Sequence, residues 1–271
     1  MNTIESARYR GYLNTELIGR PLQLTNIEWW EPDLPDVEIQ EPPPLPPRPL
    51  IFGKQMEWFF RQQLLSSDRY DLLAENLQII RNRITIGEID FILHDKLRNC
   101  LVHLEMAFKF YLYDPALPAE LPRWIGPNRR DSLLNKLDKL QSRQFPLLNE
   151  AETIKALQAH NLPDLPWIQA LYMKAQLFLP FDEQDNHPPL INASAVSGFW
   201  IPLNRIHELS NHEFYLPRKW NWVVDPAVWQ EWYSLDEILE PLKAIITQKK
   251  SPMCWMRNRN GKCERFFVVW W

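Results

Sequence analysis

The clearest hydrophobic pattern of the chain begins directly after its first fifty residues. Five apolar side chains fall at positions i, i+4, i+7, i+8 and i+12: Phe52, Met56, Phe59, Phe60 and Leu64. This spacing places them on one face of an amphipathic helix. Glu57 borders that face. The sequence therefore predicts a helix that carries a carboxylate at the edge of its buried side.

Three apolar runs follow the predicted helix, at residues 77–82, 84–93 and 100–111. They are rich in Ile, Leu, Val and Phe and are separated by polar residues, which is typical of β-strands. A second helix is predicted in RRDSLLNKLDKLQSRQ, because its leucines keep helical spacing. From residue 52 to 145 the predicted order is therefore helix, three strands, helix.

The rest of the chain is less regular. Its pattern predicts a short helix at 3–17, a strand at 171–179 and a helix at 235–247. A hairpin is predicted to close the chain, because the Asn260-Gly261 pair favours a two-residue type I′ turn. That turn would place Cys263 opposite Asn258, so Cys254 and Cys263 would not be cross-strand partners.

Burial predicts how the second and third strands pair. The polar segment 95–99 connects them as an antiparallel hairpin, and one register lets each apolar residue meet another apolar residue. The expected pairs are Leu93 with Val102, Phe91 with Leu104, and Ile89 with Met106.

The same register places two carboxylates, Asp90 and Glu105, opposite each other on the other face of the hairpin, with Cβ atoms about 5 Å apart. Opposed like charges destabilise a sheet unless a cation lies between them. Hard cations such as Mg²⁺ take carboxylate oxygens, often only one or two from the protein. Lys109 lies further along this face, where an ammonium would stabilise developing charge, and Glu88 and His103 are secondary candidates. The alternative interpretation is the solvated face of a half-exposed hairpin.

Composition narrows the function classes. The chain has 271 residues, a formal net charge of −4 and three cysteines without CxxC spacing. The acidic balance disfavours coating of nucleic acid through overall charge, and the cysteine pattern disfavours a zinc site. No apolar run reaches the ~18 residues of a membrane helix, so we expect a cytoplasmic protein without membrane contact. A local basic patch, either a phosphate site or the wet face of a helix, comprises Arg123, Arg129, Arg130, Lys136, Lys139 and Arg143.

Proline and tryptophan are both in excess, in different parts of the chain. Six of the 24 prolines lie between Pro42 and Pro49. This stretch should be extended polyproline II, either a ligand for a protein partner or a strap along the protein's own surface. Nine of the 13 tryptophans follow residue 166. They fill a core or, for Trp220 and Trp222 on one strand face, form a stacking platform. The expected organisation is an arm at 1–50, a core at 51–180 and a Trp-rich region at 181–271.

Between residues 52 and 144 the chain resembles the core of the PD-(D/E)XK nuclease-like superfamily. The resemblance rests on a helix with Glu57, the segment GEID with Asp90, the segment HLEMAFKFYL with Glu105, and the basic helix that follows. More closely, GEIDFIL, HLEMAFKFYL and WIGPNRRDSLLNKLDKLQSRQ resemble an uncharacterised bacterial family, described only as a domain of unknown function and grouped with that superfamily. The C-terminal half resembles this family loosely.

The resemblance implies an α/β, restriction-endonuclease-like core: a helix, a three-stranded antiparallel meander, a helix and a further strand, with an aromatic-rich C-terminal extension. It implies that Asp90 and Glu105 bind Mg²⁺ or Mn²⁺ and that Glu57 assists. The superfamily's usual lysine, two residues after the second acid, is Ala107 here. Lys109 would have to replace it across about 13 Å of strand, at 3.3 Å per residue.

Two functions are therefore expected. The first is a metal-dependent nuclease that acts on DNA or RNA. Its phosphate contacts would come from Arg129, Arg130, Lys136, Lys139 and Arg143. The alternative is a catalytically inactive member of the fold that binds nucleic acid, or that binds a protein partner through the segment from Pro42 to Pro49.

Overall fold

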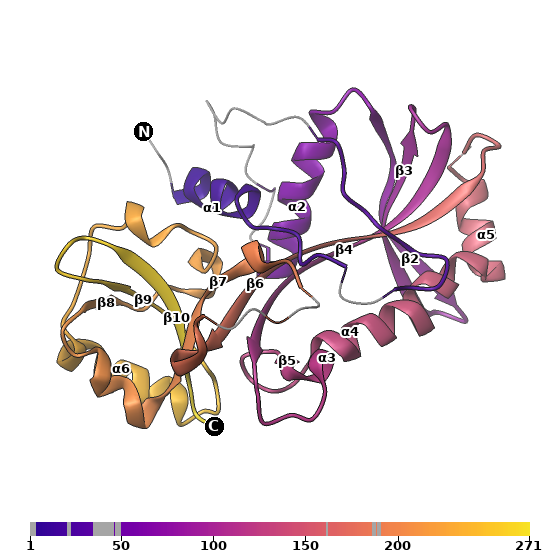
Figure 1. Cartoon of the computed structure of the whole chain (residues 1–271). Coiled ribbons are helices and arrows are strands. Elements are labelled where there is room, and N and C mark those ends of the chain that lie inside the picture. Colours follow the sequence, from indigo (N-terminus) through magenta and orange to yellow (C-terminus); the bar gives the residue numbers. More distant parts are fainter. Residues whose placement is uncertain are drawn as a thin grey trace.

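A ten-stranded mixed sheet with helices on both faces forms the centre of the described part of the chain (Figure 1). The structure is a computed structural model, and it describes residues 4–20, 23–34, 46, 50–160, 162–185, 188 and 191–271. The predicted mixed α/β class is therefore confirmed. None of the helices in these residues is long and apolar enough to cross a membrane.

The main path of the sheet runs in the order β2, β3, β4, β6, β7, β10, β9, β8. These strands are β2 (Tyr70–Arg81), β3 (Ile84–Asp95), β4 (Cys100–Tyr113), β6 (Trp167–Pro180), β7 (Val196–Pro202), β8 (Glu213–Tyr215), β9 (Met253–Arg257) and β10 (Cys263–Val269). Two short strands lie off the path: β1 (Glu28–Trp29) pairs with β6, and β5 (Trp124–Ile125) pairs with β4.

The helices are α1 (Ile4–Leu13), α2 (Phe52–Leu65), α3 (Glu120–Arg123), α4 (Leu133–Lys139), α5 (Ala151–Gln158) and α6 (Leu235–Ile246). Between α2 and α4, the strands β2, β3 and β4 form an antiparallel meander, and β6 then runs parallel to β4. This confirms the predicted order of elements. β2 begins seven residues before the predicted run, because its first half is mostly exposed or half-buried and buries only Tyr70 and Ala74.

Apolar helix faces explain how the layers pack. α1 and α2 cover one face of the sheet, where the ring of Phe60 lies 4.7 Å from that of Tyr172 and 5.1 Å from that of Phe91. α4 covers the opposite face through the fully buried Leu133 and Leu137. α6 packs on the C-terminal strands β8, β9 and β10 (Figure 1). The helices on each face of the sheet thus cover separate clusters of buried apolar residues.

The N-terminal segment packs on the sheet rather than standing apart from it. β1 runs parallel to β6, and Leu17 forms an antiparallel bridge to Lys174. The Lys174 ammonium donates to the main-chain carbonyls of Leu13 at 2.9 Å and Thr15 at 2.5 Å. The predicted polyproline stretch lies outside the described residues, apart from Pro46.

The predicted register of β3 and β4 is confirmed over its paired part. Leu93 lies opposite Val102 and Phe91 opposite Leu104, but the ladder ends there. The expected pair of Ile89 with Met106 is wrong. Ile89 is buried in a cluster with Ile92, whereas Met106 packs in the cluster under α2. The strict alternation of faces along β3 is therefore broken between residues 89 and 92.

The register predicted for the C-terminal hairpin is wrong by one residue. Cys263 lies opposite Arg257, and residues 258–262 form the connection. The cause is the side chain of Asn258, whose Oδ1 accepts the N–H groups of Asn260 at 2.9 Å and Lys262 at 3.0 Å. This local turn replaces the two-residue turn. Cys254 and Cys263 are not cross-strand partners, as predicted.

Most of the C-terminal aromatic side chains belong to the core. Trp255 is fully buried, and the half-buried Trp222 lies 5.2 Å from the ring of Phe110. Trp220 is 40% exposed. The prediction that Trp220 and Trp222 share a strand face is wrong, because Lys219–Asn221 form a 3₁₀ turn.

Asp95 holds the turn between β3 and β4 together, and its removal should destabilise the protein in a pH-dependent way. Burial raises the pKa of this fully buried carboxyl, but hydrogen bonds from Arg69, Arg98 and Leu97 outweigh burial and lower it. The ionised Asp95 carboxylate therefore stabilises the folded state above the unfolded pKa of about 4. This stabilisation is lost as the pH falls through the lower pKa of the folded state.

We expect Asp95→Asn to lower the free energy of unfolding by roughly 1 to 3 kcal/mol at pH 7, measured by urea denaturation. The difference from the unmodified protein should shrink as the pH falls below about 4. Asp68→Asn, at an exposed position, is the matched control. A loss that stays constant across this pH range would contradict the assignment.

Candidate functional site: an acidic cluster where two strands separate

The candidate site lies where β3 separates from β4. Beyond the last ladder pair, Phe91 with Leu104, the Oδ2 atom of Asp90 accepts the main-chain N–H of Met106 at 3.0 Å. A side chain thus takes a place that a strand carbonyl would otherwise fill. On the other side of β3, Asn76 of β2 has a left-handed backbone with φ of 50°. The local distortion aims Asp90 at β4.

Asp90 and Glu105 are close enough to influence each other. Burial and the nearby Glu105 carboxylate together raise the pKa of Asp90 to about 7, although the hydrogen bond from Met106 lowers it. Burial likewise raises the pKa of Glu105 to about 7. Glu105 is fully buried. Opposition of the two carboxylates was predicted from the sequence, although they meet beyond the ladder rather than as a ladder pair.

Two side chains hold Glu105 in place. His103 Nε2 lies 3.1 Å from Glu105 Oε1, and Gln144 Nε2 donates to Glu105 Oε2. The amide nitrogen of Gln169 lies 3.3 Å from His103 Nδ1, so Nδ1 accepts and Nε2 carries the proton. Burial lowers the pKa of His103 to about 4, which keeps the ring neutral at pH 7. His103 is therefore a positioning residue for Glu105.

Glu57 reaches the same region from α2. Burial and the nearby Asp90 carboxylate together raise its pKa to about 7. Lys54 Nζ donates to Glu57 Oε2 at 2.7 Å, to Glu88 Oε1 at 2.6 Å and to Asn76 Oδ1 at 2.7 Å. Glu57, Glu88 and Lys54 line a cavity of about 410 Å³. Glu88 is thus tied to Lys54, and Glu57 is the helix acid of the cluster.

Lys136 of α4 faces the acid pair from the opposite side. Burial lowers its pKa, while the Glu105 and Asp90 carboxylates raise it. Its Nζ donates to Gln144 Oε1 at 3.1 Å, and Gln144 in turn contacts Glu105. The sequence prediction gave Lys136 a different role, as a phosphate contact, and missed Gln144 and Lys54.

A π-helical turn at Leu140–Gln144 explains this geometry. In a regular α-helix, residues eight apart differ by about 80° in direction. The wider turn takes up one extra residue and brings Gln144 back toward the face of Lys136. The sequence does indicate the inward direction of Lys136. Around the helix axis Lys136 lies about 60° from the buried Leu133, whereas Lys139 lies about 120° away. The π turn itself has no such signal.

The lysine favoured by the sequence prediction has another partner. Lys109 Nζ donates to Asp131 Oδ2 at 3.0 Å. Ala107, at the position of the superfamily's usual lysine, is buried in the cluster under α4. Lys136 takes the position near the acids instead. The carboxylates of both Asp90 and Glu105 raise its pKa, and its Nζ donates to Gln144.

The predicted basic patch divides into three groups. Arg129 pairs with Asp114 at 2.7 Å, and its guanidinium lies 4.5 Å from the ring of Trp271. Lys136 points inward. Arg123 is also paired, with Glu120 at 3.7 Å. The other three residues of the patch are exposed and make no ion pair with the described residues: Arg130, Lys139 and Arg143. These three form the part of the patch that is open to a phosphate backbone.

The site offers two carboxylates, Asp90 and Glu105, as ligands for a divalent cation. Among the described residues, no group of three or more His, Cys, Asp or Glu side chains is arranged to hold a metal ion. Asp90 and Glu105 are a hard-oxygen pair, which suits Mg²⁺ or Mn²⁺ completed by water. Both carboxyl groups are buried and the Glu105 carboxylate raises the pKa of Asp90, so a cation between them would offset the cost of holding both ionised.

The fold and this site define a mixed α/β protein with a buried acidic cluster at a strand junction. The chain belongs to the family described as Domain of unknown function (DUF1853), whose model matches residues 36–269. Membership of a domain of unknown function was predicted from the sequence. No curated protein and no solved structure matches the chain. The matched region includes the acidic cluster, the basic patch and the C-terminal strands.

Neutralising Asp90 should stabilise the metal-free protein at alkaline pH. Its folded pKa of about 7 exceeds the unfolded value of about 4, so the folded state holds more protons between these values. The free energy of unfolding therefore falls as the pH rises through this window. Asparagine keeps an oxygen for the Met106 N–H but carries no charge.

We expect Asp90→Asn, in EDTA, to be more stable than the unmodified protein by roughly 1 to 3 kcal/mol at pH 8, and by much less at pH 5. Denaturant unfolding across this range measures the effect. The exposed Asp164→Asn is the control and should show no such trend. A lower stability of Asp90→Asn than of the unmodified protein at pH 8 would contradict the prediction, because it would mean that the folded state favours the ionised Asp90 carboxylate.

Proposed function

We propose that the chain is a divalent-metal-dependent nuclease of the PD-(D/E)XK type, with a restriction-endonuclease-like core. One observation carries the proposal. Acids from three elements, Glu57 of α2, Asp90 of β3 and Glu105 of β4, influence one another where β3 leaves β4. Strongly perturbed carboxyl groups gathered in this way are typical of functional sites.

Each residue then has a role. Asp90 and Glu105 would hold Mg²⁺ or Mn²⁺, which when bound supplies Lewis-acid polarisation of a phosphate and of a water molecule. His103 and Gln144 orient the Glu105 carboxylate. Lys136, not Lys109, provides the ammonium that stabilises developing negative charge, because it faces the acid pair.

The expected substrate is DNA or RNA. Arg130, Lys139 and Arg143 are exposed on the segment that carries Lys136, so a phosphate backbone along it would pass beside the acidic cluster. The three cysteines are free thiols, which supports a reducing compartment such as the cytoplasm. The polyproline stretch remains a predicted contact for a protein partner.

The proposal predicts Mg²⁺- or Mn²⁺-dependent cleavage of single- or double-stranded DNA or RNA. Asp90→Asn should abolish it, because one of the two proposed metal ligands loses its charge. Asp68→Asn, an exposed neutralisation, should leave the rate unchanged. Gel-resolved cleavage of labelled substrates with and without EDTA is the measurement. Cleavage that survives Asp90→Asn would contradict the proposal.

The same assay separates the lysines. Lys136→Met should lower kcat by roughly 10²- to 10³-fold, the usual cost of removing one donor that stabilises transition-state charge. Lys139→Met, on the same segment but exposed, should act mainly on KM. A large fall in kcat for Lys109→Met with little change for Lys136→Met would reverse this assignment.

A second candidate is a non-catalytic member of the fold that binds nucleic acid. Two observations favour it. Ala107 is buried at the usual lysine position, and both Glu105 oxygens already accept hydrogen bonds. In this case binding would need no divalent ion and would depend on the exposed part of the basic patch.

For this candidate we expect binding of a labelled oligonucleotide in EDTA. Neutralising Arg130, Lys139 and Arg143 together, each to Gln, should reduce the slope of log K against log salt by roughly 2 to 3, from the release of three counterions. Fluorescence anisotropy at several salt concentrations measures the slope. An unchanged slope would exclude this patch as the binding surface.

A further inference from the structure

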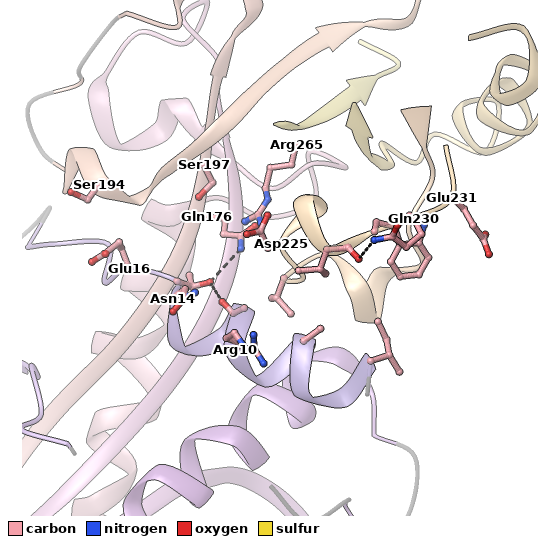
Figure 2. Close-up of a pocket in the computed structure, with 17 residues that line it drawn as sticks. Arg10, Asn14, Glu16, Gln176, Ser194, Ser197, Asp225, Gln230, Glu231 and Arg265 are labelled. Atoms are coloured by element: carbon pink, nitrogen blue, oxygen red, sulfur yellow. Dashed lines mark hydrogen bonds between the residues drawn. The ribbon is translucent and has the colours of Figure 1, made fainter. Parts of the chain in front are cut away.

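A cavity of about 690 Å³ lies between α1 and the C-terminal segment, on the α1 side of β6 and β10 (Figure 2). None of its lining residues belongs to the acidic cluster. Its volume is in the range of small-molecule sites, roughly 300 to 1,000 Å³. Three of its polar groups lack the partners that such groups normally have in a protein interior.

The first is the guanidinium of Arg265, which extends from β10 into the cavity (Figure 2). Its Nη2 donates one long hydrogen bond, 3.2 Å, to the carbonyl of Val224. Burial lowers its pKa, although the charge of Asp225 acts in the opposite direction. Neither Asp225 nor any other described carboxylate forms an ion pair with it. A partly buried cation of this kind is costly unless an anion accompanies it.

The second and third are a buried acceptor and a buried donor. Gln176 is 2% exposed, and its Nε2 donates to Thr15 Oγ1 at 3.3 Å, but its Oε1 has no hydrogen-bond partner among the described residues. The indole N–H of Trp229 likewise lacks an acceptor there. Buried groups of this kind are normally satisfied, often by a ligand or water.

The other lining residues indicate the chemical class of the ligand. Asp225 lines the cavity near Arg265 and Gln176 (Figure 2), and its Oδ1 accepts the N–H of Ala227 at 3.0 Å. A simple anion beside Arg265 would therefore meet a carboxylate as well. The apolar residues that line the cavity are Ile4, Ala7, Val223, Val228 and Trp229.

We propose that this cavity binds a small zwitterion of the α-amino-acid type with an apolar side chain. Its carboxylate pairs with Arg265. Its ammonium faces Asp225, beside the buried amide of Gln176, so that Arg265 and Asp225 each gain an opposite charge. The side chain lies against Val228 and Trp229. This binding needs no metal and is independent of the nuclease proposal.

Calorimetric titration in EDTA tests the proposal, with L-phenylalanine and L-leucine as probes. We expect saturable binding of at least one probe. Arg265→Gln should weaken it by roughly 10- to 100-fold, the usual effect of losing a hydrogen bond to a charged partner. Arg259→Gln, exposed on the β9–β10 connection, is the matched control and should bind normally. The absence of binding for both probes would overturn the proposal.

Two ligand derivatives test whether both charges of the zwitterion are needed, and a second variant tests the position of the ligand without changing Arg265. L-phenylalaninamide lacks the carboxylate and N-acetyl-L-phenylalanine lacks the ammonium, so both should bind at least 10-fold more weakly than L-phenylalanine. Equal binding of either derivative would overturn the proposed charge pairing. Val228→Trp should fill the cavity and remove binding without touching Arg265. Unchanged affinity of this variant would place the ligand elsewhere.

Discussion

The parallel pairing of β4 with β6, continuous from Leu101 to Leu112, is the interaction on which the candidate site depends. Because β6 holds one edge of β4 along this whole length, β3 can leave the other edge after Leu104 while the sheet stays intact. The main-chain groups that this separation frees need new partners. Asp90 supplies one of them, and a carboxylate is thereby held beside Glu105 at the centre of the molecule.

The charges at this junction are held at a cost in stability. Glu57, Asp90 and Glu105 are desolvated together, and each has a pKa near 7. Lys54 compensates from the α2 side and Lys136 from the α4 side, so cations approach the cluster from both faces of the sheet. Well-packed apolar side chains would be at least as stable in such a place. The arrangement is therefore easier to explain by chemistry than by folding.

The sequence predicted those features that depend on burial along one element. The Leu93–Val102 and Phe91–Leu104 pairs follow from matching apolar faces, and so does the buried side of α2. It could not predict features in which a local polar contact overrides the pattern. Asn258 changes the turn of the last hairpin through its own main chain.

The candidate site shows the same division. The opposed acids Asp90 and Glu105 were predictable from alternation along two strands, and the helix acid Glu57 was taken from the resemblance. His103, on the same strand face as Glu105, was predicted as a secondary candidate, but its contact with Gln169 of β6 was not. Gln144 was not predictable, because it reaches Glu105 through a π turn. The inward direction of Lys136 on its helix was predictable, but only the tertiary structure shows that Asp90 and Glu105 lie opposite it.

The central claim is that the acid pair at the β3–β4 junction binds a divalent cation. Anomalous diffraction from crystals grown with Mn²⁺ tests it most directly, because the ion is located without reference to activity. The account predicts an anomalous peak within about 2.5 Å of carboxylate oxygens of both Asp90 and Glu105, absent from Asp90→Asn crystals. A fully occupied Mn²⁺ elsewhere, with Asp90 and Glu105 still joined only to protein groups, would contradict it.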